Sequence, residues 1–309
     1  MIKLKIIIFL VCIIIFPSCN NEVVTLPIKI DSVNKRIYLP ITFNGVTSDF
    51  LFDTGSAFSF VKEGHSLYST QGKDIRVIRF NGDTVSKMYQ NGHFKLGSLS
   101  KVESFILCDA ADPNILGMNL ISKYYWMFDL EKEIVQISKK PIKYLPNEKL
   151  VLDYYMSDYG VMNLRLPIDQ DRTLVMMFDT GSWNKPSFLL FHNGDPLRSW
   201  DSHGLGIIYK AKSATNAAWM FEELTVDKYR IDYPLFVFDN DLERINKYNG
   251  LGYNGLVSID FIHRYKQFYI DAKSNKIIFH KKNMEKIDEM KFFFEDYMLI
   301  LNQQRKGKE

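Results

Sequence analysis

Short stretches in which apolar and polar residues alternate, separated by clusters of turn residues, occupy most of the chain. The first stretch, 36–43, ends at a turn formed by Asn44-Gly45 and is followed by a second, 47–52. A similar pair occupies 161–168 and 173–178. Alternation with a period of two is typical of β-strands that have one buried face. Each pair therefore predicts two antiparallel strands.

An Asn-Gly pair at 81–82 lies between two further β-rich stretches, 75–79 and 84–89. Both residues accept the positive φ angles of a type I′ turn, so the pair is a strong hairpin signal. We expect a β-hairpin whose tip contains Phe80, Asn81 and Gly82. The second half of the chain has no clear counterpart, and its best glycine-rich candidate is His203-Gly204-Leu205-Gly206.

The two halves of the chain match again near their ends. Residues 114–124 and 255–265 agree position by position in apolar, small and polar character, and each segment precedes another β-rich stretch, 128–137 or 270–279. The sequence therefore predicts two copies of one β-rich unit. The second copy is longer, and we place its additional residues in loops around 188–212 and 239–254.

The segments outside the two copies have different patterns. A linker with two prolines, 141–152, joins the copies. Over 284–300 the apolar residues recur at helical spacing, which predicts an amphipathic C-terminal helix. Packing against a lobe is the ordinary role of such a stripe, and binding of a partner is the alternative. The stripe consists of Ile287, Met290, Phe294 and Met298.

The N-terminus has the pattern of an export signal. Lys3 and Lys5 precede an unbroken apolar run, 6–16, which is short for a membrane span but suits a signal-peptide core. Ser18-Cys19 follows this run and resembles a bacterial lipobox, which implies that Cys19 is lipidated and becomes the mature N-terminus. We expect a lipid anchor in a bacterial membrane of the cell envelope, facing the periplasm or the cell surface. A secreted protein and an uncleaved anchor are the alternatives.

These patterns divide the chain into five segments. They are a signal peptide at 1–19, an N-terminal lobe at 20–140, a linker at 141–152, a C-terminal lobe at 153–282, and a helix with its tail at 283–309.

Composition limits what such a protein can be. Cys108 is the one cysteine beyond the leader, so no disulfide can form within the mature chain, which must rest on its hydrophobic core. The 46% hydrophobic content is sufficient for that core. The net charge of +3 comes from scattered cations, which is not a nucleic-acid footprint. The six histidines form no i, i+4 pair, so we expect no metal and no cofactor.

One pentapeptide occurs twice. Phe-Asp-Thr-Gly-Ser stands at 52–56 and again at 178–182, each time directly after an apolar run. A lone Asp-Thr-Gly is weak evidence because Asp and Gly are ordinary turn residues. Two identical pentapeptides at equivalent places in a duplicated unit predict that the fold brings Asp53 and Asp179 together. Duplication followed by loss of chemistry is the alternative.

Two carboxyl groups in contact can hydrolyse an amide. Like charges at contact cannot both ionise, so one group keeps a proton while the other acts as a base. The base deprotonates a water as it attacks the carbonyl carbon, and the protonated group hydrogen-bonds the carbonyl oxygen. The pair titrates as a unit.

The other motif residues suit this task. The glycines allow a tight turn that directs a backbone N–H at the carboxylate. The threonines can bond across to the backbone of the opposite copy, and the serines can bond the outer carboxylate oxygens. These supporting residues are Thr54, Gly55, Ser56, Thr180, Gly181 and Ser182.

The paired motif, the hairpin and the later Ile-Leu-Gly element resemble the aspartic proteases, and with the leader they resemble bacterial aspartyl-protease lipoproteins. The resemblance covers roughly residues 30–280. It implies an all-β, bilobal acid-protease fold with two tandem retropepsin-like β-barrel lobes and hairpin flaps, here with a short C-terminal helix. It also implies that Asp53 and Asp179 are the catalytic pair of an endopeptidase that acts on polypeptides. A single chain supplies both aspartates, so we expect a monomer.

One departure from the family and two other functions bear on this expectation. Ser258 stands where the first copy has Gly117 and where the family prefers glycine. An exported protein of the same fold could instead hold extended peptides without cutting them, and an envelope structural lipoprotein is a third possibility. Neither needs paired carboxylates, which would only destabilise it.

Overall fold

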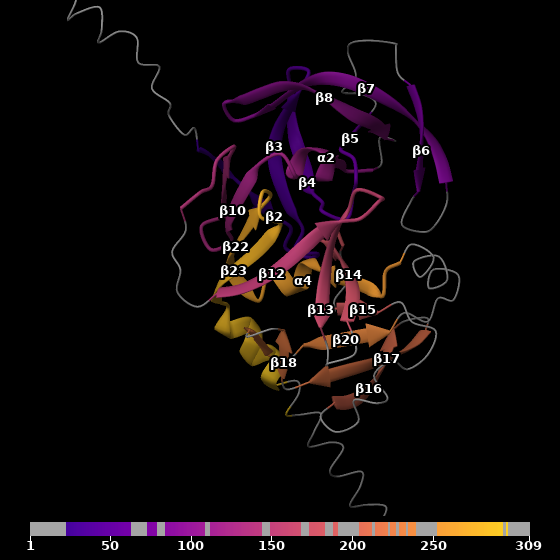
Figure 1. The fold of residues 1–309 in the computed structure, drawn as a ribbon, viewed down its shortest axis with the longest axis vertical. Coiled ribbons are helices and arrows are strands. Elements are labelled where there is room, and N and C mark those ends of the chain that lie inside the picture. Colours follow the sequence, from indigo (N-terminus) through magenta and orange to yellow (C-terminus); the bar gives the residue numbers. More distant parts are fainter. Residues whose placement is uncertain are drawn as a thin grey trace, which may run out of the picture.

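A computed structural model gives the fold, which consists almost entirely of β-strands arranged as two lobes joined by a shared sheet (Figure 1). The structure describes residues 23–62, 73–78, 84–108, 112–143, 149–167, 173–182, 188–190, 204–211, 214–221, 223–226, 229–232, 234–238, 252–292 and 295.

The first lobe is a closed β-barrel. The order of its strands is β2-β3-β4-β9-β5-β8-β7-β6, and an additional pairing of β3 with β7 closes the ring. Within it the predicted turn at Asn44-Gly45 is present, with positive φ angles of 49° and 85°. The strands are β2 (Lys29–Ile30), β3 (Ile37–Phe43), β4 (Val46–Phe52), β5 (Phe60–Lys62), β6 (Lys73–Ile78), β7 (Thr84–Leu96), β8 (Leu99–Cys108) and β9 (Asn114–Leu116).

The second lobe repeats this topology. Its order, β13-β14-β21-β15-β20-β17-β16, matches the first lobe strand for strand, and both lobes pair their motif strand in parallel with a later strand, β4 with β9 and β14 with β21. The predicted duplication is therefore confirmed. The strands are β13 (Met162–Pro167), β14 (Thr173–Asp179), β15 (Phe188–Leu190), β16 (Gly204–Ala211), β17 (Ala214–Phe221), β20 (Leu235–Phe238) and β21 (Gly255–Ser258).

The second lobe differs from the first in two respects. Among the described strands no pairing of β13 with β17 closes a ring as β3 and β7 do. An additional hairpin, β18 (Glu223–Val226) and β19 (Tyr229–Asp232), stands between β17 and β20, where the first lobe has only a tight turn. Part of the extra length therefore lies at this hairpin, outside the two loops in which we placed it.

A six-stranded sheet joins the lobes. Its order is β1-β11-β10-β22-β23-β12, so strands that close the first copy lie beside strands that close the second. The predicted linker is shorter than expected because Lys149–Leu152 already form part of β12 and pair with β23. The strands are β1 (Val24–Pro27), β10 (Tyr125–Asp129), β11 (Ile134–Ser138), β12 (Lys149–Met156), β22 (Tyr265–Asp271) and β23 (Lys276–Lys282).

A row of buried aromatic rings connects the two motif strands through this sheet. Phe52 packs against Phe128 with ring centroids 4.8 Å apart, and Phe128 stacks on Phe268 at 4.4 Å. Phe268 and Phe279 lie 6.3 Å apart, and Phe279 meets Phe178 at 6.2 Å. All five rings are almost fully excluded from solvent. Aromatic contacts of this kind fix the relative position of the strands that end at the two aspartates.

Helices are short and few among the described residues. α2 (Met118–Ile121) follows β9 and α4 (Ile259–Ile262) follows β21, at equivalent places in the two copies. Residues 284–292 and 295 are helical, as the C-terminal pattern predicts. In the apolar stripe Ile287 is buried and Met290 is half-buried, whereas Phe294 and Met298 lie outside the described residues.

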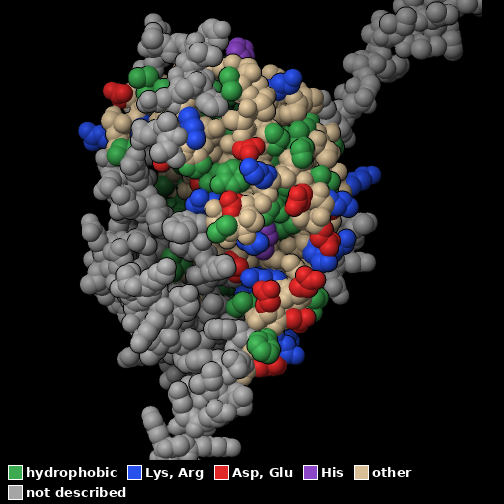
Figure 2. Space-filling view, turned by 180° about the vertical axis from the view of Figure 1, so that it is seen from behind, with side chains coloured by type: hydrophobic (Ala, Val, Ile, Leu, Met, Phe, Trp, Pro, Cys, Tyr) green, Lys and Arg blue, Asp and Glu red, His purple; other side chains and the backbone are tan. Residues whose placement is uncertain are grey.

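Acidic and basic side chains are interspersed on the face of the described residues that Figure 2 shows, with no region of a single sign. Cys108 is buried, and its thiol donates to the carbonyl of Pro113. Within the described part of the chain, no helix is long and apolar enough to cross a membrane.

Candidate active site

The two copies of the Asp-Thr-Gly-Ser motif meet where the lobes join. Asp53 follows β4 directly and Asp179 ends β14, so each strand delivers its aspartate to the same place. The backbone N–H of Asp53 donates to the carbonyl of Leu116 on β9, which fixes the start of the first turn. In the second copy Asp179 stands opposite Ser258 in the parallel ladder.

Four reciprocal hydrogen bonds lock the two turns together. The backbone N–H of Thr54 donates to Thr180 Oγ1 at 3.0 Å, and the N–H of Thr180 donates to Thr54 Oγ1 at 3.2 Å. The Thr54 hydroxyl donates to the carbonyl of Phe178 at 2.5 Å, and the Thr180 hydroxyl to that of Phe52 at 2.6 Å. Both threonines are completely buried. The cross-copy bonds predicted for the threonines are therefore present.

Each glycine turns its backbone toward the carboxylate of its own copy and leaves space for that of the other. The N–H of Gly55 donates to Asp53 Oδ1 and that of Gly181 to Asp179 Oδ1, both at 2.9 Å. A Cβ atom on Gly55 would stand 2.6 Å from Asp179 Cγ, and one on Gly181 would stand 2.3 Å from Asp53 Cγ. Any side chain at either position would displace the opposite carboxyl group.

The two carboxyl groups lie close together. Each stands against the backbone of the other copy's glycine, and each acts on the pKa of the other. Asp179 is buried, with 7% of its surface exposed, and Asp53 is half-buried. Two carboxyl groups in this position can hydrogen-bond each other only by sharing a proton, because a carboxylate has no hydrogen to donate.

Burial raises the pKa of both aspartates above the ordinary value of 3.8. The pKa of Asp179 is raised further, because the charge of Asp53 disfavours a second ionisation beside it. The hydrogen bond from Gly55, the side chain of Asp179 and the positive charge of Arg36 oppose the rise of the pKa at Asp53. Both carboxyl groups therefore ionise less readily than an ordinary aspartate, and the pair resists losing its second proton.

The motif serines do not act as predicted. The Ser56 hydroxyl donates to the carbonyl of Phe58 at 2.8 Å, and the Ser182 hydroxyl donates to the backbone carbonyl of Asp179 at 3.1 Å. The expected bonds from these hydroxyls to the outer carboxylate oxygens are therefore wrong. The backbone N–H groups of both serines, rather than the hydroxyls, favour the ionised carboxylates. A nearby carbonyl competes for a serine hydroxyl in a tight turn.

The hairpin predicted in the first copy is present as β6 and β7, paired from Lys73↔Tyr89 to Ile78↔Thr84. Its tip, with Phe80, Asn81 and Gly82, lies outside the described residues. The second copy has the equivalent hairpin as β16 and β17, but Gly204 and Gly206 stand in its first strand. Both glycines pair with residues of β17 within the ladder, so the glycine-rich segment is not the turn we expected.

Ser258 is accommodated in the second copy at the place where the first copy has Gly117. It is fully buried and begins α4, where its Oγ accepts a hydrogen bond from the backbone N–H of Asp260 at 3.3 Å. Gly117 begins α2 with no side-chain cap, and a Cβ there would meet the carbonyl oxygen of Phe58 at 2.2 Å. The first copy therefore requires glycine at this place, whereas the second uses a capping serine.

Sequence reasoning missed Arg36. Its Nε donates to the carbonyl of Gly181 at 2.8 Å, so a side chain of the first copy reaches the motif of the second. The pairing register of β3 and β4 indicates that Arg36 lies beside the site. Tyr38 pairs with Leu51, and extending that register by two residues places Arg36 opposite Asp53.

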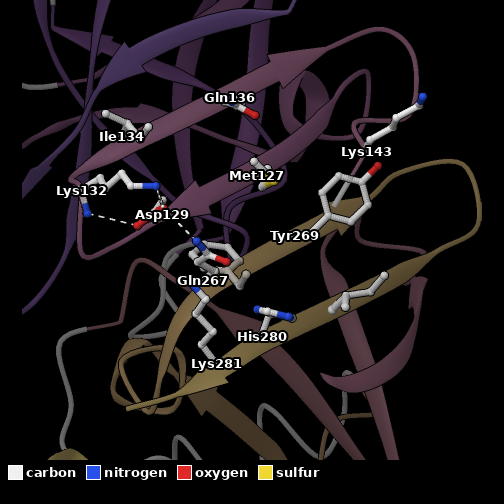
Figure 3. A pocket seen from close by; sticks show the side chains of 12 residues that line it. Met127, Asp129, Lys132, Ile134, Gln136, Lys143, Gln267, Tyr269, His280 and Lys281 are labelled. Carbon is white, nitrogen blue, oxygen red and sulfur yellow. Dashed lines mark hydrogen bonds and ion pairs between the residues drawn. The ribbon is translucent and has the colours of Figure 1, made fainter. Parts of the chain in front are cut away.

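A pocket of about 280 Å³ lies elsewhere in the molecule, on the outer face of the shared sheet (Figure 3). Asp129 there accepts bonds from Lys132 and Gln267, beside Tyr269 and His280. Asp129 and His280 are adjacent in their strands to Phe128 and Phe279, whose rings pack against those of the motif strands. The pocket and the paired aspartates therefore lie on opposite sides of the sheet.

Comparison with solved structures identifies the fold. The aspartic proteinase from Irpex lacteus superposes with a TM-score of 0.55 over 85% of this chain and 98% of its own, at 10% identity. No model of a known protein family matches the sequence, and no curated protein matches it either. The chain thus has the predicted all-β, bilobal acid-protease fold.

Replacing Thr54 by Val should destabilise the protein by about 2–3 kcal/mol, because the buried N–H of Thr180 and the carbonyl of Phe178 would both lose their partner. Chemical denaturation monitored by circular dichroism measures the change. The matched control is Thr47→Val, which removes an exposed hydroxyl that bonds Thr42. An equal effect of both substitutions would contradict the role given to Thr54.

Replacing Asp179 by Asn should raise the melting temperature at neutral pH. The pKa of Asp179 is higher in the folded protein than in the unfolded chain. The neutral carboxyl group therefore stabilises the fold fully below about pH 3.8, and this stabilisation is lost as the pH rises through the pKa of Asp179 in the folded protein. The amide that replaces the carboxyl group cannot ionise and avoids this loss. Scanning calorimetry from pH 3 to pH 8 should show the two melting temperatures diverging as the pH rises. The exposed control Asp153→Asn should show no such divergence, and a constant difference for Asp179→Asn would refute the buried-charge explanation.

Proposed function

We propose that the protein is an aspartic endopeptidase in which Asp53 and Asp179 activate one water molecule. The observation that carries this proposal is that the reciprocal bonds of Thr54 and Thr180 join the two motifs and set the carboxyl groups of Asp53 and Asp179 close together, where burial raises the pKa of both. A pair that holds one shared proton offers a base and an acid at the same point.

The reaction follows from this arrangement. A polypeptide binds between the lobes with its scissile carbonyl beside the pair. The ionised carboxyl takes a proton from water as the water oxygen attacks the carbonyl carbon, and the protonated carboxyl donates to the carbonyl oxygen. A proton then passes to the leaving nitrogen as the C–N bond breaks. The pair returns to its state with one proton, and both halves of the peptide leave.

The motif glycines and threonines serve this chemistry by holding the carboxyl groups close together. The two glycine N–H groups each fix one carboxylate oxygen, and the threonine bonds prevent the turns from separating. Pre-organised groups of this kind lower the barrier because they need not rearrange during the reaction. The substrate is an extended segment with apolar side chains, covered by the β6–β7 hairpin.

A peptide-binding protein without catalysis is the second candidate. Its binding would use strand edges and would not need a buried pair of carboxyl groups. Burying two like-charged groups costs stability, and a protein that only binds peptides has no use for the pair. The close approach of Asp53 and Asp179 therefore favours the enzyme.

We also propose that the mature protein is attached to a bacterial membrane by a lipid on Cys19. The sequence around Ser18-Cys19 supports this, since an anchor in the leader segment needs no membrane-spanning helix in the folded part. The enzyme would then act in the cell envelope as a monomer, because a single chain supplies both aspartates.

Residues 20–309 should cleave unfolded polypeptides between apolar residues, with greatest activity on the acid side of neutrality. Asp53→Asn and Asp179→Asn should each lower kcat by about 100-fold or more, because each removes half of the acid–base pair. Mass spectrometry of the products across pH 3–8 measures both effects.

The matched control for this experiment is Asp49→Asn, an exposed aspartate on β4. It should leave cleavage unchanged. If the parent protein binds peptides but cuts none of them at any pH, the non-catalytic binder is the correct function. Loss of activity from only one of the two active-site substitutions would show that the pair does not act as a unit.

The purified membrane-bound protein should begin at Cys19 and carry lipid on its sulfur. Intact-mass analysis before and after mild hydrolysis of ester-linked lipid measures this modification. Cys19→Ala should release the protein from the membrane fraction, whereas Cys12→Ala should leave it attached, because Cys12 lies within the leader. An unmodified Cys19 in the membrane fraction would exclude the lipid anchor.

A further inference from the structure

The turn before β3 connects the first copy to the second at two points. The carbonyl of Lys35 accepts a hydrogen bond from His263 Nε2, just after α4, at 2.8 Å. One residue later, Arg36 Nε donates to the carbonyl of Gly181 in the second motif at 2.8 Å. Gly181 is the residue whose backbone lies against the carboxyl group of Asp53.

The second copy has an equivalent turn, with an apolar residue where the first copy has Arg36. Tyr38 pairs with Leu51 in the first copy and Asn163 with Met177 in the second. Extending both registers by two residues places Arg36 opposite Asp53 and Val161 opposite Asp179. The preceding residues, Lys35 and Gly160, have matching positive φ angles of 61° and 76°.

Each turn also meets the motif of the other copy. Arg36 contacts Gly181, and a Cβ atom on Gly160 would stand 3.4 Å from the Cβ atom of Ala57. The two turns are therefore related by the duplication in backbone and in position. They differ in that one carries a guanidinium at the carboxyl pair and the other carries the apolar Val161.

We infer that Arg36 is a positioning residue that makes the two aspartates inequivalent, so that Asp53 is the ionised base and Asp179 is the acid. This inference rests on the proposed function and specifies the roles within it. Asp179 is the more deeply buried of the two, which already disfavours its ionised form. The guanidinium of Arg36 adds to this difference, because its fixed positive charge favours the ionised form of Asp53.

The electrostatics of the pair agree with the geometry. The charge of Arg36 lowers the pKa of Asp53, whereas the charge of Asp53 raises that of Asp179. Among the described residues, these are the charged side chains that act most strongly on the pair. His263 holds the turn, and burial lowers its pKa, so it remains neutral at physiological pH while its Nε2–H donates to Lys35.

The titration of the two carboxyl groups tests this inference without using catalysis. The mature protein is labelled with ¹³C at the aspartate carboxyl carbons, and its NMR spectrum is followed from pH 2 to pH 8. Asp53→Asn and Asp179→Asn assign the two resonances. In the parent protein the first ionisation of the pair should appear mainly at Asp53. In Arg36→Met this step should move up by about one pH unit, since a nearby opposite charge lowers a carboxyl pKa by about 1–3 units.

Two control variants separate the charge from other effects. Arg36→Lys keeps the charge and should move the step less than Arg36→Met. Lys266→Met removes one positive charge from an exposed pair with Glu131 and should not move it. A first ionisation at Asp179 in the parent protein would overturn the inference, even if Arg36→Met failed to fold. An unchanged titration in folded Arg36→Met would also overturn the inference.

Activity distinguishes this inference from the proposed function. The acidic limb of the kcat/KM profile should rise with the first ionisation in Arg36→Met. Cleavage with an unshifted acidic limb and an unshifted titration would contradict the role of Arg36 and leave the endopeptidase intact. A shifted titration in a protein that cleaves no peptide would support the role of Arg36 and contradict the endopeptidase.

Discussion

The reciprocal bonding of Thr54 and Thr180 is the constraint on which the site depends. Each buried hydroxyl accepts from the backbone of the other copy and donates to it, so neither turn satisfies its polar groups alone. Unpaired buried polar groups are costly, which means that the two motifs are stable only when they are joined. Once they are joined, the absence of a side chain at Gly55 and Gly181 lets the two carboxyl groups meet.

The remainder of the fold holds these turns in place. The buried row from Phe52 through the shared sheet to Phe178 connects the strands that precede the two aspartates. Strands from both copies pair within this sheet, where β10 of the first lies beside β22 of the second, so the lobes cannot shift independently beneath the site. The energetic cost of two buried carboxyl groups is thus offset by a continuous hydrophobic core.

The sequence predicted those parts of the structure that local patterns determine. Alternation located the strands around each motif, and the repeated pentapeptide predicted both the contact between the copies and the bonds of the threonines. The serine hydroxyls were predicted wrongly, because a choice between a carboxylate and a nearer carbonyl depends on the shape of the turn. The start of β12 and the contact of Arg36 depend on partners more than a hundred residues away, which no local pattern specifies.

Neutron diffraction from deuterated crystals grown on the acid side of neutrality tests the central claim most directly, because it locates hydrogen positions. We expect one deuteron between the facing oxygens of Asp53 and Asp179 and none on the outer oxygens. Two carboxylates without a deuteron between them, each hydrated separately, would show that the pair shares no proton and would contradict the proposed mechanism.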